Sequence, residues 1–180
     1  MNILTVNLAL STLVFWVAAR IYVVPRLGQW NEKNILVPIL LLHSFRHLGL
    51  MFLAPGATYP GMPPQFAHPA AWGDLVTAAL AMTAILSGTP RPLVWIFNVV
   101  GTIDLLAVIA LATIYGAPAF MGPAYWIPAF WVPALLVTHY LTFVVLTEKK
   151  LTWKVAVARS SVHEDGVDDR LHRPRDSRGA

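Results

Sequence analysis

The sequence predicts an all-α membrane protein, a bundle of five transmembrane helices. The chain has 180 residues, of which 57% are hydrophobic and only 12% are charged. Its mean hydropathy is +0.61. Because a soluble domain usually carries about a quarter charged residues, most of this chain is too apolar for a soluble core. Five stretches have about the ~20 residues that a helix needs to cross the hydrocarbon core. They are residues 3–24, 34–54, 71–88, 91–114 and 124–147.

The third stretch is the shortest of the five. Residues 87–92 separate it from the fourth, and their prolines, Pro90 and Pro92, suit the beginning of a helix better than its interior. The alternative is a protein with four spans, in which residues 71–88 are only partly inserted.

Basic residues predict the orientation of the helices and favour five spans. The connections at residues 55–70 and 116–123 contain neither Lys nor Arg. The basic residues that flank the other connections and follow the last span are Arg20, Arg26, Lys33, Arg91, Lys149, Lys150 and Lys154. The positive-inside rule therefore predicts an outside N-terminus and a cytoplasmic C-terminus in a plasma membrane, such as a bacterial inner membrane. Four spans would place Arg91 and Lys149 on opposite sides.

The polar tail, the absence of cysteine and the net charge limit the partners and the chemistry that we expect of this chain. Residues 1–158 are predicted to form the bundle, and residues 159–180 a disordered cytoplasmic tail, because the tail has almost no apolar surface to bury. The chain has no cysteine, which excludes disulfides and thiolate metal sites. Topology explains the net charge of +4, so no nucleic-acid partner is expected. The expected partners are the lipid bilayer and either a second copy or a larger membrane complex.

Ionisable residues lie inside the predicted helices, where they are costly to bury and often functional. His43, Arg46 and His47 occupy positions i, i+3 and i+4 near the middle of the second span, so we expect them on one face. Asp104 has a similar depth in the fourth span and is the simplest partner of Arg46, with Asp74 as an alternative or additional partner. The other polar candidates at depth are Asn98 and His139.

Each member of this set also has a structural interpretation. Asp74 could only cap the third helix, because Gly73-Asp74 lies near its predicted start. Asn98 and His139 could each be a satisfied buried polar residue. A hydrogen bond between membrane helices contributes only ~0.6 kcal/mol on average, which is little in return for burying an arginine and two aspartates. For the cluster as a whole, function is therefore the favoured interpretation.

Three functions fit the pattern, and the sequence ranks them in this order. The first is small-ligand or proton-linked binding or transport, with ligand-binding residues His43, Arg46, His47, Asp74, Asn98 and Asp104. The second is a cofactor site, either haem b or a divalent metal (Zn or Fe), with metal ligands His43, His47 and His139. The third is an accessory subunit of a larger membrane complex. The sequence does not identify a ligand or cofactor, and it contains no nucleotide-binding or nucleophile motif that would indicate an enzyme.

Overall fold

The computed structural model describes residues 3–27 and 29–147 of the chain. This part is helical, with short connections and no strand. Its five helical segments are long and apolar enough to cross a membrane: Ile3–Arg26, Glu32–Leu53, Pro64–Leu86, Arg91–Ile114 and Gly122–Thr147. The prediction of an all-α chain with five such segments is confirmed, and the third segment is long and apolar enough to span a membrane like the others. The predicted tail at residues 159–180 lies outside the described residues.

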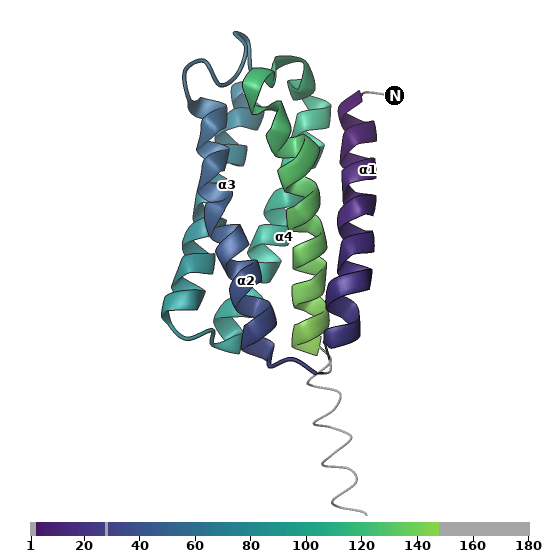
Figure 1. Cartoon of the computed structure of the whole chain (residues 1–180). Coiled ribbons are helices and arrows are strands. Elements are labelled where there is room, and N and C mark those ends of the chain that lie inside the picture. Colours follow the sequence, from purple (N-terminus) through teal and green to yellow (C-terminus); the bar gives the residue numbers. More distant parts are fainter. Residues whose placement is uncertain (1–2, 28, 148–180) are drawn as a thin grey trace, which may run out of the picture. The chain divides into compact units, whose positions relative to one another are not determined.

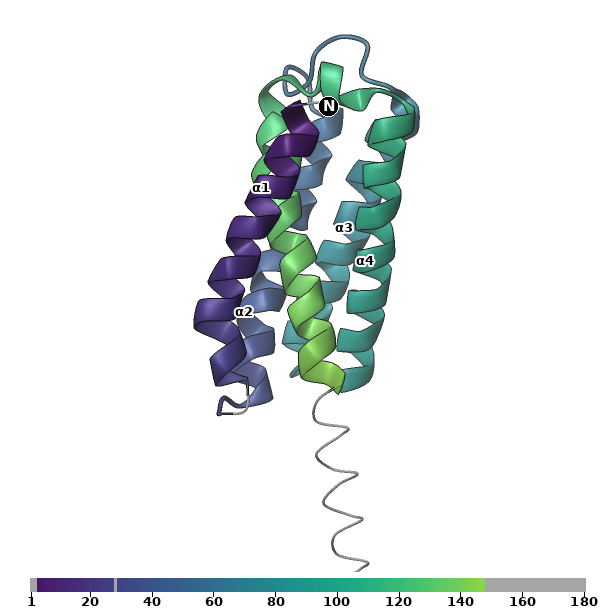
Figure 2. The ribbon, with the colours of Figure 1, turned by 90° about the vertical axis from the view of Figure 1, so that its right-hand side faces the viewer.

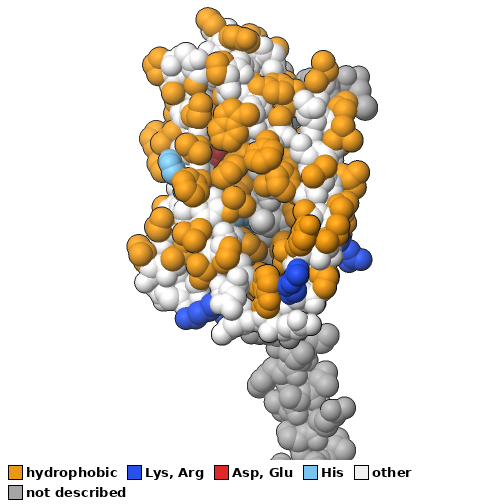
Figure 3. Space-filling model, in the orientation of Figure 1, with side chains coloured by type: hydrophobic (Ala, Val, Ile, Leu, Met, Phe, Trp, Pro, Cys, Tyr) orange, Lys and Arg blue, Asp and Glu red, His pale blue; other side chains and the backbone are white. Residues whose placement is uncertain are grey.

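The helices up to Val145 lie side by side and run alternately up and down (Figure 1). The four labelled helices are α1 (Ile3–Ala18), α2 (Glu32–Ser44), α3 (Pro64–Leu86) and α4 (Arg91–Ile114). The connections at residues 54–63 and 115–121 meet at one end, here called the proline end. Residues 29–31 and 87–90, which lie in two connections, are at the opposite end, here called the basic end, and Lys and Arg side chains gather there (Figure 3).

Polar contacts join the elements at both ends. At the proline end, the backbone N–H of Tyr59 donates to the Phe120 carbonyl at 2.8 Å, and that of Ala124 donates to the Ala57 carbonyl at 2.9 Å. At the basic end, Arg91 Nη1 of α4 lies 2.9 Å from the Glu32 carboxylate of α2. The two proline-end connections are therefore bonded to each other and cover that end of the bundle.

Helix α3 begins at Pro64, which is earlier than the predicted residue 71. Pro64 occupies the start of the helix, where its missing N–H and fixed φ cost little. Pro69 lies inside the helix and is tolerated there. The prediction had placed residues 55–70 in a connection because of their prolines. With the longer helix, Asp74 lies well inside α3 and cannot be its N-cap, so that interpretation is wrong.

The fifth span begins with irregular turns before residues 132–147 continue as an α-helix. Residues Ile127–Trp131 form a π-helical segment that includes Pro128. Proline lacks the N–H that an α-helix would use, and a wider turn is one way to accommodate it. Phe130, in this segment, packs edge-on against Phe15 of α1, with ring centroids 5.3 Å apart.

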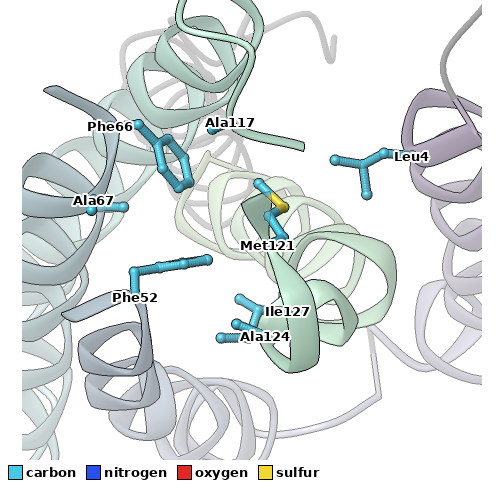
Figure 4. Packing of buried hydrophobic residues seen from close by; sticks show 9 residues of the cluster. Leu4, Phe52, Phe66, Ala67, Ala117, Met121, Ala124 and Ile127 are labelled. Atoms are coloured by element: carbon cyan, nitrogen blue, oxygen red, sulfur yellow. The ribbon is translucent and has the colours of Figure 1, made fainter. Parts of the chain in front are cut away.

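One cluster of the apolar core lies near the proline end, whereas α1 lies at the edge of the bundle. Figure 4 shows this part of the core, the cluster Leu4, Phe52, Phe66, Ala67, Ala70, Ala117, Met121, Ala124 and Ile127. Leu4 is the buried residue of α1, and large apolar side chains such as Leu13 and Val14 remain exposed. Exposed apolar surface of this kind suits a helix that contacts lipid.

Candidate functional site

Arg46 is the centre of a buried charge network. Its side chain is 0% exposed, and its Nε donates to Asp74 Oδ1 at 2.6 Å while its Nη2 donates to Asp104 Oδ2 at 2.5 Å. Both partners considered from the sequence are therefore present, and each takes a different N–H of the guanidinium. A buried charge is tolerated only when it is paired in this way. With both carboxylates ionised, the three side chains carry a formal charge of −1.

The third nitrogen of Arg46 connects this group to the fifth span. Nη1 donates to the Gly101 carbonyl at 3.2 Å and lies 3.3 Å from His139 Nε2. Because Nε2 accepts from the guanidinium, the ring proton is on Nδ1, which donates to Asn98 Oδ1 at 2.7 Å. His139 is therefore a neutral imidazole and does not change the charge of the site. A Cβ on Gly101 would lie 2.6 Å from His139 Cε1, so glycine leaves the room for the ring.

A change of helix geometry places Arg46 in the interior. Helix α2 ends at Ser44, and Phe45–Leu53 continues as a 3-10 helix, which is unusually long for this type. The buried residues here recur at every third position: His43, Arg46, Gly49 and Phe52. With three residues per turn, His47 falls outside this face and is exposed. The expectation that His43, Arg46 and His47 share one face is thus wrong for His47, because it assumed α-helical periodicity.

Two glycines make room for the carboxylates. A Cβ on Gly49 would lie 2.2 Å from Asp74 Oδ2, and a Cβ on Gly73 would lie 1.8 Å from Asp104 Oδ1. Neither side chain could keep its position against an alanine. Gly49 and Gly73 are not among the site residues predicted from the sequence, although a glycine within a predicted span and away from its ends is a signal of close packing.

The two carboxylates lie at the inner end of an apolar cavity of about 330 Å³. Walls of the cavity include Leu4, Leu8, Phe66, Leu105, Val108 and Met121. The side chains of Asp74 and Asp104 are 14% and 16% exposed, whereas that of Arg46 is fully buried behind them. In Figure 3, acidic surface is visible in a recess among hydrophobic side chains. A molecule in the cavity would therefore meet carboxylate oxygens and apolar walls, and not the arginine.

His43 is buried beside the network without joining it. Its Nε2 lies 2.9 Å from Thr138 Oγ1, and that hydroxyl donates to the Ala134 carbonyl at 2.8 Å. Nε2 of His43 is therefore the donor, and Nδ1 is an acceptor with no partner among the described residues. The ring packs on His139, with centroids 4.2 Å apart.

This geometry does not support the predicted cofactor site. His43 and His139 pack directly against each other, which leaves no space for an iron between their rings. His47 is exposed, and its Nδ1 is bonded to the Ser44 carbonyl at 2.9 Å. Within the part of the chain that the structure describes, no group of three or more His, Cys, Asp and Glu side chains could hold a metal ion. The described structure therefore does not bring His43, His47 and His139 together as ligands of one metal.

The fold and the site define a helical protein with five potential membrane spans around a buried Arg–Asp–His network. Residues 3–147 match the family described as Domain of unknown function (DUF8737), and the chain belongs to this family. Neither the curated proteins nor the solved structures compared with the chain contain a match. Because the family description assigns no activity, the geometry of the site has to carry the functional argument.

Proposed function

We propose that this protein binds a small ligand through Asp74 and Asp104, in a plasma membrane such as a bacterial inner membrane. One observation carries the proposal: both carboxylates bind the buried Arg46, yet both remain accessible from an apolar cavity. The uneven distribution of basic residues supports an outside N-terminus and a cytoplasmic C-terminus. The bilayer is then the solvent of the exposed apolar surface, and the cavity lies at its outer side.

A purely structural role explains the network less well. A single carboxylate would compensate the charge of Arg46, and replacing a buried ion pair by apolar residues is often neutral or stabilising. Here two carboxylates surround one guanidinium, and three glycines leave room for the arrangement. Protein interiors are otherwise closely packed. A cavity of about 330 Å³ also falls within the range of ~300–1,000 Å³ that is typical of ligand sites.

The chemistry of the inner end selects a hydrogen-bond donor. An ionised carboxylate can only accept hydrogen bonds, and the excess charge of −1 favours a cation. Arg46 holds both carboxylates in place and contributes no surface of its own to the cavity. The ligand is thus expected to carry an ammonium or a similar N–H donor, with a proton as its simplest competitor for the same charge.

The cavity is closed on its basic-end side. The residues that follow the carboxylates in that direction on α4, Phe97 and Asn98, are fully buried, as is Val94. Transport across the membrane would therefore require the charge network to rearrange, whereas binding would not. Binding is the part of the proposal that this conformation supports directly. Assembly with a second copy or with a larger membrane complex stays a prediction.

The test uses hexylammonium as a small, water-soluble probe and the purified full chain in detergent. At a ligand concentration of about 100 times Kd, binding stabilises a folded protein by ~2.7 kcal/mol, which is visible as an increase in Tm. We expect this increase in the wild type and its loss in Asp104→Asn. Glu32→Gln is the matched control, because it neutralises a carboxylate at the basic end. An equal increase in Tm for the wild type and Asp104→Asn would contradict the proposal.

A further inference from the structure

We infer that the ligand is a single-chain amphiphile with an ammonium head, which reaches the carboxylates from the bilayer through an opening between α1 and α4. The inference rests on the proposed function and specifies its substrate class and route of access. Four features of the cavity support it: the helices that form its walls, the cover at the proline end, the charge at its inner end and its length.

Two helices, α1 and α4, each contribute a wall of the cavity. Leu4, Thr5 and Leu8 contribute from α1, whereas Leu105 and Val108 contribute from α4. Figure 2 shows α1 and α4 apart, with the cover of residues 115–121 above the space between them. The cavity therefore lies behind a seam between two helices whose outer surfaces face lipid in the proposed orientation.

Contacts hold α1 on the fifth span and not on α4. Trp16 packs on Tyr140 with ring centroids 5.0 Å apart, and Asn7 Nδ2 donates to the Tyr125 hydroxyl at 3.3 Å. The partners in these contacts, Tyr125 and Tyr140, both belong to the fifth span. These contacts of α1 with the fifth span would remain if α1 and α4 moved apart.

Buried side chains form much of the rest of the cavity wall. The connections at the proline end are bonded to each other, and the buried side chains of Met121 and Ala117 lie beneath them. Phe66 of α3 and Ile127 of the fifth span close the wall opposite the seam. The exposed lining residues are Thr5 on α1, Thr113 on α4, and Gly116 and Ala119 in the adjoining connection at the proline end. The opening therefore lies between the proline-end halves of α1 and α4.

The length of the cavity and the charge at its inner end indicate which class of ligand it binds. The lining on α4 runs from Asp104 to Thr113, which is about 14 Å of helix at ~1.5 Å per residue. This elongated apolar surface suits a hydrocarbon tail, and the acceptor-only inner end with its excess negative charge suits an ammonium head. A tail can extend through the seam into the hydrocarbon while the head binds Asp74 and Asp104. Lipid-dissolved primary amines combine these two properties.

The test compares two amines on the full chain reconstituted in phosphatidylcholine nanodiscs. Dodecylammonium probes tail and head together, and hexylammonium probes mainly the head. We expect dodecylammonium to bind at least tenfold more tightly than hexylammonium. Dodecanol and dodecyl sulfate have the same tail without the cation, and we expect neither to compete. If dodecyl sulfate competed equally, the inner end would not be selecting a cation, and the inference would fall.

A matched pair of substitutions on α4 tests the route. Ala112 lines the cavity and Ala107 is exposed without lining it, so Ala112→Trp fills the seam and Ala107→Trp does not. We expect Ala112→Trp to weaken dodecylammonium binding at least tenfold and hexylammonium binding less than threefold. Ala107→Trp should change neither. Ala112→Leu is the smaller second variant if the tryptophan prevents folding, as judged by size-exclusion chromatography and circular dichroism.

The outcomes separate the inference from the proposed function. If hexylammonium binds and requires Asp104, but dodecylammonium binds no more tightly, the ligand is a water-soluble amine and the inference is overturned while the proposed function stands. Equal effects of Ala112→Trp and Ala107→Trp would overturn the lateral route. If neither amine binds the wild type, both the inference and the proposed function fail.

Discussion

Arg46 Nη2 and Asp104 Oδ2 lie 2.5 Å apart, and this contact joins the 3-10 helix of the second span to the middle of α4. The same guanidinium also binds Asp74 of α3 through Nε at 2.6 Å. One arginine thus connects three spans, and its Nη1 reaches the fifth through His139. Substituting any one of these groups should therefore change the stability of the protein or its binding of a ligand.

Replacing Arg46 should destabilise the protein strongly. Arg46→Met leaves two carboxylates without their cation, and breaking a buried pair in this way typically costs ~3–5 kcal/mol. Thermal unfolding in detergent measures the loss. The control is the triple variant Arg46→Met, Asp74→Asn, Asp104→Asn, which removes the uncompensated charge and should recover much of the stability. A wild-type Tm for Arg46→Met alone would show that the carboxylates do not depend on the arginine.

Gly73→Ala should be destabilising because its Cβ would lie 1.8 Å from Asp104 Oδ1. Overpacking of a tight site typically costs ~1–3 kcal/mol, and here it also displaces a carboxylate from Arg46. The unfolding temperature of the single variant should therefore fall. Combining it with Asp104→Ser removes the colliding atoms, so the two changes should be less than additive. Strict additivity would mean that the two residues do not touch.

His43 and His47 should respond differently to substitution by alanine. His43 is buried and donates from Nε2 to Thr138, so we expect His43→Ala to cost ~2–4 kcal/mol through a cavity and a lost hydrogen bond. His47 is exposed, and a surface change of this kind usually stays within ~0.5 kcal/mol. If both variants lost the same free energy of unfolding, His43 and His47 would be equally buried on one helical face, which would contradict the 3-10 geometry.

Hexylammonium binding should weaken as the pH falls. The charged groups around the inner end are Arg46, Asp74 and Asp104, and His139 faces Arg46 as a neutral acceptor. A proton on either carboxylate removes the excess negative charge, and a proton on His139 adds positive charge, so each works against a cation. The apparent Kd should increase with acidification by up to about tenfold per pH unit, since one proton competes with one ammonium.

A series of Kd values from pH 8 to pH 5 checks this dependence. The control is the Tm of the ligand-free chain over the same pH range, because a change in that Tm would report a change in the protein itself. A Kd for hexylammonium that is constant over this range would contradict competition for the same carboxylates.

Several features of the fold and site could be predicted from local information. Apolar length and low charge predict the five spans, because a helix must bury about 20 apolar residues to cross a bilayer. Equal depth in two spans predicts that Arg46 pairs with Asp104, since a charge in apolar surroundings requires a partner. These arguments need only residue type and distance along a helix, and the structure agrees with both.

Other features depend on contacts between helices and could not be predicted in this way. The change to 3-10 geometry at Phe45 exposes His47 and buries Gly49, and nothing in the local periodicity of this span predicts it. The early start of α3 was hidden by Pro64 and Pro69, which are equally typical of connections. Glycine is required at position 73 because the carboxylate of Asp104, on a neighbouring helix, occupies the space of a Cβ.

By itself, then, the sequence determined that the chain is helical, how many segments can span a membrane, and that Arg46 must find an acid at its own depth. Tertiary structure decided which side chains face that arginine, that Asp74 and Asp104 both do, and that they border a cavity between α1 and α4. The physical reason is that burial of apolar length is a property of each segment alone. The shape of a site instead depends on how several helices leave space for one another.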